Sequence, residues 1–286
     1  MTGSATLPES AAILADVRRA LSEDIGSGDA TADLLPVDAT ASANVITREA
    51  AVLCGQAWFD ACFRELDAHI EIEWHAQDGE HIAANQRLVS LHGNARALVG
   101  AERCALNFLQ TLSGTATTTA THVAAVSGTR TRVLDTRKTL PGLRLAQKYA
   151  VRCGGGDNHR IGLFDAILIK ENHIAAAGSI TAAVAAARLR HPELLLEVEV
   201  ENFTELHEAL EARADRVMLD EFSDSDLRRA VDEVAGKAQI EVSGGVDLAR
   251  LRAIAETGVD YVSIGALTKH VRAIDLSMRI NVRGQA

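Results

Sequence analysis

The chain has 286 residues, a net charge of −10, and 47% hydrophobic but only 3% aromatic residues. This length fits one large domain with a smaller companion, and the aliphatic composition favours helices packed on a parallel sheet over an aromatic-rich β-sandwich. The acidic balance argues against nucleic acid or anionic membranes as partners. The four cysteines lack metal-ligand spacing, so we expect reduced thiols without zinc or disulfides. No apolar run approaches the ~20 residues of a membrane span, so we expect a soluble, cytoplasmic protein.

The first part of the chain predicts a small α+β domain over residues 1–112. An apolar stripe between Ile13 and Leu21 predicts a helix with Ser10 at its N-cap. From residue 43 strand-like segments alternate with a helical segment at 56–66. A further helix is expected over about 95–112, and we place the domain boundary at its end.

Residues 113–286 form the second predicted domain, in which a strand and a helix repeat six times. The strand segments are TRVLDT, DAILIK, LLLEVEVE, RVMLD, QIEVSG and YVSIG, and helices are expected near 143–153, 179–190, 203–213, 224–235 and 247–257. Such units imply parallel strands with right-handed crossovers, in a barrel or a doubly wound sheet. We also expect a C-terminal helix, with room to pack back on the first domain.

Polar residues follow all six strands, and this observation distinguishes the two folds. In a closed barrel all strand ends surround one mouth, where barrel enzymes place their chemistry, whereas an open sheet concentrates its site at one crevice. Six contributing strands therefore favour an α/β fold of the barrel kind. We predict an incomplete, six- to seven-stranded TIM-like α/β barrel.

A group of cations between residues 135 and 173 reverses the sign of this acidic chain locally. These cations stand beside Leu-Pro-Gly at 140–142 and the triple glycine 154–156 rather than along one helix face. Arginine offers a planar fork to carboxylates or phosphates and lysine a compact charge, so the mixture predicts a ligand with several anionic groups. His159 has no second ligand at metal spacing and suits a hydrogen-bond donor to an anion. The group comprises Arg137, Lys138, His159, Arg160 and Lys170.

Two carboxylates, Glu199 and Asp220, close the third and fourth strands. They either form ion pairs with neighbouring cations or bind sugar hydroxyls or hydrated Mg²⁺, which prefers one or two carboxylates plus substrate phosphates. Glu197, Glu199 and Glu201 share one strand parity, which leaves open which of them points into the site.

Glycine turns follow the fifth and sixth strands. Glycines at such turns let backbone N–H groups approach a ligand, and a following helix N-terminus favours phosphate. Two consecutive turns of this kind match the phosphate site common in barrels. The residues concerned are Ser243, Gly244, Gly245, Ile264, Gly265 and Ala266.

The motifs of this chain resemble those of the quinolinate phosphoribosyltransferase family, also named carboxylating nicotinate-nucleotide pyrophosphorylases. They are, in order, TRKTLPGLRLAQKYAV, GGGDNHRIGLFDAILIKENHI, EVEVEN, VMLDEFS, EVSGGV and VSIGALT, preceded by VLCG and AERCALNFLQTLSGTAT. The resemblance covers nearly the whole chain. Departures at Glu221 and at Lys269-His270 touch no proposed catalytic position.

The resemblance implies that quinolinate and 5-phosphoribosyl 1-diphosphate react with Mg²⁺ present to give nicotinate mononucleotide, pyrophosphate and CO₂, a step of NAD biosynthesis. It also implies a homodimer in which Arg103 of one subunit completes the site of the other, and it leaves open further assembly. Lys170 would lie near the reacting centre, Glu199 and Asp220 would hold the ribose or Mg²⁺, and the glycine turns would hold the 5-phosphate. The dicarboxylate would bind to Arg137, Lys138, His159 and Arg160, with Thr136 in the same substrate-binding set.

Two alternatives differ in function class. A nicotinate phosphoribosyltransferase would share the phosphate and ribose parts but bind one carboxylate fewer, and the full cation set argues against it. A non-catalytic ligand-binding barrel would have lost Lys170, Glu199 or Asp220, and all three are present.

Overall fold

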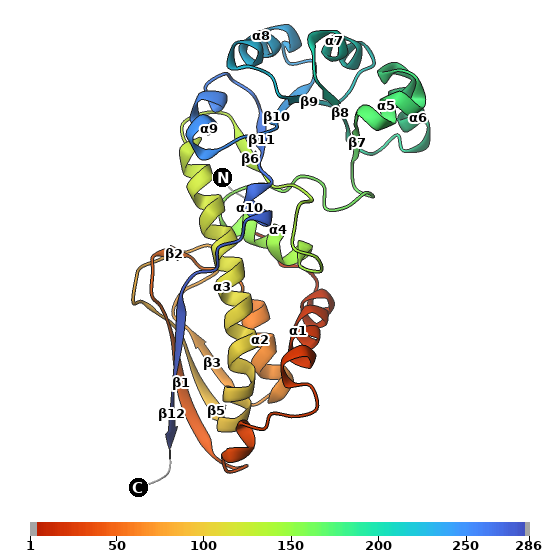
Figure 1. Ribbon diagram of the computed structural model, residues 1–286. Coiled ribbons are helices and arrows are strands. Elements are labelled where there is room, and N and C mark those ends of the chain that lie inside the picture. Colours follow the sequence, from red (N-terminus) through yellow and green to blue (C-terminus); the bar gives the residue numbers. More distant parts are fainter. Residues whose placement is uncertain (1–4, 284–286) are drawn as a thin grey trace. The chain divides into compact units, whose positions relative to one another are not determined.

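The computed structural model describes residues 5–283 of the chain (Figure 1). It contains two compact units, and the chain passes between them more than once. The first unit comprises residues 1–120, 139–155 and 267–286, and the second comprises 121–138 and 156–266. The helix predicted near 143–153 therefore belongs to the first unit, although the sequence placed it among the barrel repeats.

The first unit is an antiparallel sheet with helices against it (Figure 1). Its main sheet has the strand order β12-β1-β5-β3, and a second pairing joins β2 to β4. The strands are β1 (Thr40–Thr47), β2 (Ala51–Val52), β3 (Glu71–Trp74), β4 (His81–Ile82), β5 (Arg87–Asn94) and β12 (Leu276–Arg283). The helices are α1 (Ser10–Ile25), the 3-10 turn Ala32–Leu34, α2 (Gln56–Leu66), α3 (Ala95–Ala125), α4 (Arg144–Cys153) and the short α10 (Ala266–Lys269).

The C-terminal segment is a strand, and the expected C-terminal helix is wrong. β12 pairs antiparallel with β1 along its whole length, from Thr40 opposite Arg283 to Thr47 opposite Leu276. The segment LSMRIN alternates apolar and polar residues, and Leu276, Met278 and Ile280 pack against the core. A period of two is the pattern of a half-buried strand.

Helix α3 continues to Ala125, well past the predicted end near residue 112. The added turns are rich in Ser, Thr, Ala and Gly, so no apolar stripe marked them in the sequence. Ser113, Thr115 and Thr119 are nevertheless buried. Gly114 lies against the backbone carbonyl of Arg272, where a side chain would clash. Close packing of small residues, rather than an apolar stripe, therefore stabilises this part of the helix.

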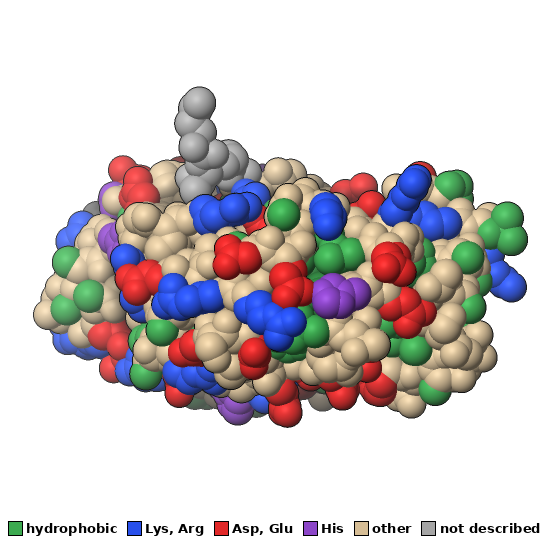
Figure 2. Space-filling model, turned by 90° about the horizontal axis from the view of Figure 1, so that it is seen from above, with side chains coloured by type: hydrophobic (Ala, Val, Ile, Leu, Met, Phe, Trp, Pro, Cys, Tyr) green, Lys and Arg blue, Asp and Glu red, His purple; other side chains and the backbone are tan. Residues whose placement is uncertain are grey.

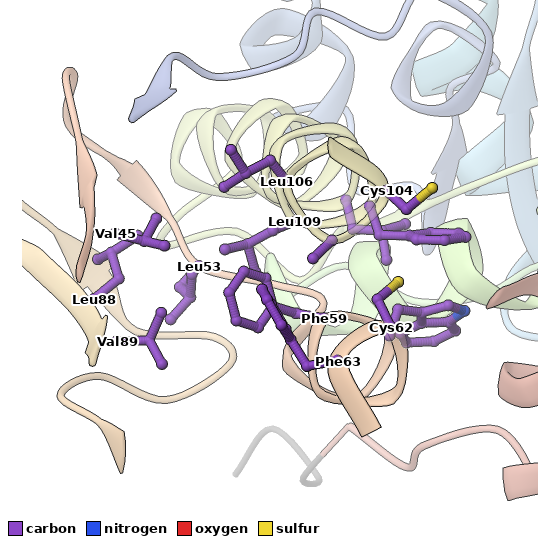
Figure 3. Packing of buried hydrophobic residues seen from close by; sticks show 14 of the residues in the cluster. Val45, Leu53, Phe59, Cys62, Phe63, Leu88, Val89, Cys104, Leu106 and Leu109 are labelled. Carbon is purple, nitrogen blue, oxygen red and sulfur yellow. The ribbon is translucent and has the colours of Figure 1, made fainter. Parts of the chain in front are cut away.

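The core of the first unit joins α2, α3 and the main sheet. Figure 3 shows Phe59 and Phe63 of α2 facing Leu109 of α3. The rings of Phe59 and Phe63 lie 4.9 Å apart, and the ring of Phe59 lies 5.1 Å from that of Trp74 in an edge-on arrangement. Aromatic pairs at these separations add to the free energy gained from burial.

The second unit is a parallel sheet that forms the predicted incomplete TIM-like α/β barrel, with helices along its outer side (Figure 1). The strand order is β6-β11-β10-β9-β8-β7, and a parallel bridge from Leu134 to Asp157 adds a short pairing beside β6. The strands are β6 (Arg132–Leu134), β7 (Ile167–Ile169), β8 (Leu196–Val200), β9 (Arg216–Asp220), β10 (Gln239–Ser243) and β11 (Tyr261–Ser263). The helices are α5 (Glu171–Ala177), α6 (Ile180–Arg190), α7 (Phe203–Glu211), α8 (Asp224–Val234) and α9 (Leu248–Ala255).

All six predicted strands are confirmed, as are the helices predicted near 179–190, 203–213, 224–235 and 247–257, but α5 was missed. It starts directly after Lys170 and has no buried residue, so it lacks the apolar stripe that predicts a helix. Serine or asparagine side chains cap the helices α6, α7 and α8: Ser179, Asn202 and Ser223 each accept a backbone N–H of the first turn. Among residues 5–283, no helix is both long and apolar enough to cross a membrane.

The core of the first unit gives a stability prediction. Phe59 is fully buried, so we expect Phe59→Ala to lower the free energy of unfolding by about 3–5 kcal/mol. Leu34, 82% exposed, is the control, and Leu34→Ala should change it by less than about 0.5 kcal/mol. Urea unfolding followed by tryptophan fluorescence measures this, because both tryptophans, Trp58 and Trp74, lie in this unit. Equal midpoints for the two variants would contradict the packing described.

Candidate functional site

The parallel sheet of the second unit has one apolar face and one polar face. Residues paired in parallel register share a face, which groups Glu199 with Met218 and Glu241, and Asp220 with Ser243. The alternate residues, such as Val198, Val217 and Val242, are buried and apolar. The polar face therefore continues, at the carboxyl ends of the strands, into the residues predicted to bind the ligand.

The predicted cations begin directly after β6, and the buried Asp135 that precedes them binds the segment that carries His159. Asp135 is fully buried, and its Oδ1 accepts the backbone N–H of His159 at 2.9 Å while its Oδ2 accepts the amide of Asn158 at 2.7 Å. The hydroxyl of Thr136 accepts the backbone N–H of Lys138 at 3.1 Å. These contacts fix the segment after β6 against the segment that carries His159.

His159 lies against a pair of buried carboxylates. The sequence named one, Glu197, only among three glutamates that could point into the site, and it did not name the other, Glu241. Nε2 of His159 is 2.9 Å from Oε2 of Glu197 on β8 and 3.5 Å from Oε2 of Glu241 on β10. Arg216 on β9 approaches the same Glu241 oxygen at 3.2 Å, and its guanidinium lies 4.2 Å from the centre of the Tyr261 ring. We name Glu197 and Glu241 the buried glutamate pair.

Burial raises the pKa of both glutamates of this pair. It raises the pKa of Glu197 to about 7, against the opposing charge of Arg216. It raises the pKa of Glu241 to about 8, helped by the negative charge of Glu197. The pair therefore retains protons at pH values where exposed glutamates are ionised, and its two titrations belong to the pair as a whole.

The structure also resolves which carboxylate of β8 faces the lysine of β7. Lys170 Nζ forms an ion pair with Glu199 Oε2. Glu197 is buried two residues deeper on the same face, and Glu201 is exposed beyond the end of the strand. Of the three glutamates that sequence parity left open, Glu199 stands next to Lys170.

Arg137 and Arg160 form a region of concentrated positive charge. Burial lowers the pKa of Arg160, and the positive charge of Arg137 lowers it further. Because these two causes both disfavour the guanidinium cation, a nearby anion is stabilising at this position. One nitrogen of Arg160 also lies 3.5 Å from the carbonyl of Ala166.

The two glycine turns lie close to charged side chains of neighbouring strand ends. A Cβ at Gly244 would stand 2.6 Å from Oδ1 of Asp220, and a Cβ at Gly265 would stand 2.9 Å from Cδ of Lys138. Such distances exclude a side chain without displacement of these neighbours. Gly244 and Gly245 also adopt positive φ angles, 87° and 53°, which glycine tolerates best.

Arg103 and Cys153 lie in the first unit. Arg103 is an exposed residue of α3, and its role in a shared site stays a prediction. Cys153 ends α4, and its ligand atom lies within 4.8 Å of those of Cys54 and Asp78, a cluster that sequence spacing did not reveal. Asp78 accepts hydrogen bonds from the Gly55 backbone and the Tyr149 hydroxyl, at 3.0 and 2.9 Å. Burial raises the pKa of the Cys54 thiol, which keeps it protonated and unreactive.

The surface shown in Figure 2 carries basic and acidic side chains interspersed with one another. On this face the cations do not gather into one extended patch.

Comparison with known proteins identifies the family. The model of the quinolinate phosphoribosyl transferase N-terminal domain matches residues 29–113, and that of the C-terminal domain matches residues 115–279. The chain belongs to this family. The match spans both domains, so the polar strand ends described above lie within the C-terminal domain of that family.

Relatives of the same kind cover almost the whole chain. A probable nicotinate-nucleotide pyrophosphorylase [carboxylating] of Bacillus subtilis (strain 168) is 39% identical, over 92% of each chain. The nicotinate-nucleotide pyrophosphorylase [carboxylating] of Mycobacterium leprae is 40% identical, over 92% of this chain and 95% of its own. The solved structure of the nicotinate-nucleotide pyrophosphorylase from Francisella tularensis is 49% identical, with a TM-score of 0.93 over 98% of this chain and 100% of its own.

The raised pKa of Glu241 predicts how the stability of the protein depends on pH. A carboxyl whose pKa is raised on folding stabilises the protein fully below its unfolded pKa, and this contribution is lost as pH rises toward the folded value near 8. Glu241→Gln removes the proton linkage of this group. We therefore expect the stability of the variant, relative to the unmodified protein, to increase between pH 5 and pH 8, by at most about 1.4 kcal/mol per pH unit for one proton.

Urea unfolding by circular dichroism across this pH range measures the effect. The matched control is Glu211→Gln, because Glu211 is exposed. Its free energy of unfolding should depend on pH in the same way as that of the unmodified protein. Parallel curves for Glu241→Gln as well would show that Glu241 does not hold a proton on folding.

Proposed function

We propose that this protein transfers the phosphoribosyl group of 5-phosphoribosyl 1-diphosphate to quinolinate and decarboxylates the product, giving nicotinate mononucleotide, pyrophosphate and CO₂ for NAD biosynthesis. The observation that carries the proposal is the polar face of the second unit: cations for a polyanion and carboxylates for a cationic ribose meet at adjacent strand ends. Both family domains match in order. A tobacco relative, 40% identical over 93% of this chain, is named quinolinate phosphoribosyltransferase [decarboxylating].

The cations account for the acceptor. Quinolinate carries two carboxylates, and Arg137, Lys138 and Arg160 offer guanidinium and ammonium donors around the segments that Asp135 holds together. The lowered pKa of Arg160 means that a bound carboxylate stabilises its cation. His159 stands beside them, and Thr136 orders the backbone of Lys138. A carboxylate with bidentate arginine contacts is bound strongly and in a defined orientation.

The carboxylates account for the phosphoribosyl donor. Glu199 on β8 and Asp220 on β9 end adjacent strands and supply the oxygen donors that Mg²⁺ prefers alongside substrate phosphates. Bound Mg²⁺ would neutralise charge on the leaving pyrophosphate. The glycine turns at 243–245 and 264–266 would hold the 5-phosphate through backbone N–H groups.

The reaction then follows from charge placement, without a covalent enzyme intermediate. As the bond from ribose C1 to pyrophosphate breaks, positive charge develops on the ribose, and the carboxylates of Glu199 and Asp220 stabilise it. The pyridine nitrogen forms the new bond to C1. The quaternised ring accepts the electron pair released when the adjacent carboxylate leaves as CO₂, and that ring carbon then takes a proton. Lys170, paired with Glu199, is placed to orient the departing groups.

We further propose a cytoplasmic homodimer in which Arg103 serves the partner's site. The four free cysteines support a reducing compartment. Relatives from Arabidopsis and tobacco are named chloroplastic and mitochondrial. Support for Arg103 is its exposure on α3, where a second subunit can reach it.

The proposed reaction makes a stoichiometric prediction. With both substrates and Mg²⁺, purified protein should release CO₂ and pyrophosphate in a one-to-one ratio from quinolinate. Replacement of Lys170 by Ala should lower kcat by about 100-fold or more, because an oriented charge at the reacting centre is lost. Radiolabelled CO₂ trapping and a coupled pyrophosphate assay measure both products. Pyrophosphate formed from nicotinate but not from quinolinate would assign the protein to nicotinate phosphoribosyl transfer.

The shared site predicts complementation between inactive subunits. Arg103→Ala and Lys138→Ala should each be inactive alone, because each lacks one cation of every site. Mixed subunits should regain part of the activity, since one site of a mixed dimer keeps both cations. The assay is activity after subunit exchange, with exchange verified by native mass spectrometry of a tagged partner. Mixed dimers that remain inactive would show that Arg103 does not act across the interface.

A further inference from the structure

The ring of His159 is held by the protein at both of its nitrogens. The backbone N–H of Arg160 donates to Nδ1 at 2.8 Å, so Nδ1 carries a lone pair and the ring proton resides on Nε2. Nε2 in turn donates to Oε2 of Glu197 at 2.9 Å, with Oε2 of Glu241 at 3.5 Å. This arrangement fixes one tautomer and one ring orientation.

The carboxylates below His159 are buried and held on rigid strands. Glu197 is 1% and Glu241 0% exposed, and their side chains come from β8 and β10 with Arg216 of the intervening β9 against Glu241. One oxygen of each, Oε1, has no hydrogen-bond partner from another group in the described structure. Burying carboxylates costs free energy relative to apolar residues of similar size. A stabilising role in the core therefore does not explain the pair, whereas a role at the adjacent site does.

The other side of the same segment is anchored as well. Asp135 accepts the backbone N–H of His159 and the side-chain amide of Asn158. The segment 158–160 is thus fixed from β6 on one side and from β8 and β10 on the other. It carries Arg160 toward the like charge of Arg137, a placement that repulsion would loosen without such anchors.

We propose that Glu197 and Glu241 are positioning residues of the anion site. Through the Nε2–H of His159 they hold the imidazole in one tautomer, and through its Nδ1 they fix the backbone amide of Arg160, so that the guanidinium of Arg160 stays aimed at a ligand carboxylate. The role rests on the proposed function only in the identity of the ligand, a pyridine dicarboxylate. Hydrogen-bonded groups behind a contact residue commonly set its orientation in this way.

Two substitutions of Glu197 separate positioning from bulk structure. Glu197→Gln keeps a carbonyl oxygen that accepts from Nε2–H, whereas Glu197→Met keeps the length of the side chain and removes the acceptor. We expect Glu197→Met to raise the KM for quinolinate roughly tenfold to a hundredfold, with a smaller change in the KM for 5-phosphoribosyl 1-diphosphate. Glu197→Gln should restore most of the affinity. Glu241→Met, at the longer distance from Nε2, should have a smaller effect in the same direction.

Nitrogen-15 NMR of the histidines, in protein without substrate, reads the tautomer directly. His159 should show the Nε2–H pattern in the unmodified protein and in Glu197→Gln, and a shifted or mixed pattern in Glu197→Met. The exposed pair of His207 and Glu233, 2.5 Å apart, is an internal reference. Glu233→Met breaks that pair and should leave both the His159 signals and the kinetics unchanged.

Several results would overturn the proposal. One is a Glu197→Met variant in which both the NMR pattern of His159 and the KM for quinolinate are unchanged. Another is a variant in which the KM values of both substrates rise equally. A divalent metal that copurifies one to one and is lost from Glu197→Met would make the cluster of His159, Glu197 and Glu241 a metal site instead, since its ligand atoms lie within 4.8 Å of one another. If Glu197→Met does not fold, Glu241→Met and the glutamine variant decide by the same two readouts. If the unmodified protein does not react with quinolinate but the NMR result is as expected, the proposed function is refuted. The positioning of His159 by Glu197 then still holds.

Discussion

The two-residue period of the parallel strands is the constraint on which the second unit depends. In β8, β9 and β10 the residues of one parity are aliphatic and buried, and those of the other parity are charged or polar apart from Met218. A sheet covered by helices on one side must bury its apolar face there. The polar residues therefore lie on the opposite face, where successive strands align them in a column that ends at the residues proposed to bind the ligand. The same alternation thus builds the core and orders the chemistry.

Charge balance within this column lets an acidic chain carry cations at the proposed polyanion site. Glu199 pairs with Lys170, Glu241 with Arg216, and Asp135 orders the segment of His159 through backbone and amide donors. Arg137 and Arg160 then add positive charge at the strand ends. Glu241, the partner of Arg216, is buried within the sheet, whereas Glu199 and Lys170 pair at the carboxyl ends of their strands. The net charge of the chain therefore says little about the field at the site.

Much of this arrangement could be predicted from the sequence, because strand repeats and polar strand ends are local patterns. The six strands and the cations after β6 and β7 were found in this way. The buried glutamate pair was not, because a single charged residue in an apolar strand gives no sign of which residue lies across from it. Glu241 and His159 are far apart in the sequence and approach one another only in the folded protein. β12 was missed for a different reason: a lone alternating segment finds its partner strand far away in the chain.

The pairing of β12 with β1 has a consequence for synthesis of the chain. β1 has β5 on one side early, but its other edge is covered only when residues 276–283 emerge at the end of translation. Until then the nascent first unit carries an open strand edge, which is the kind of surface that pairs with other chains. Contacts between such distant segments also form slowly. A ribosome stalled late in this message would therefore release a product with an aggregation-prone edge, although its polar strand ends and both glycine turns would already be complete.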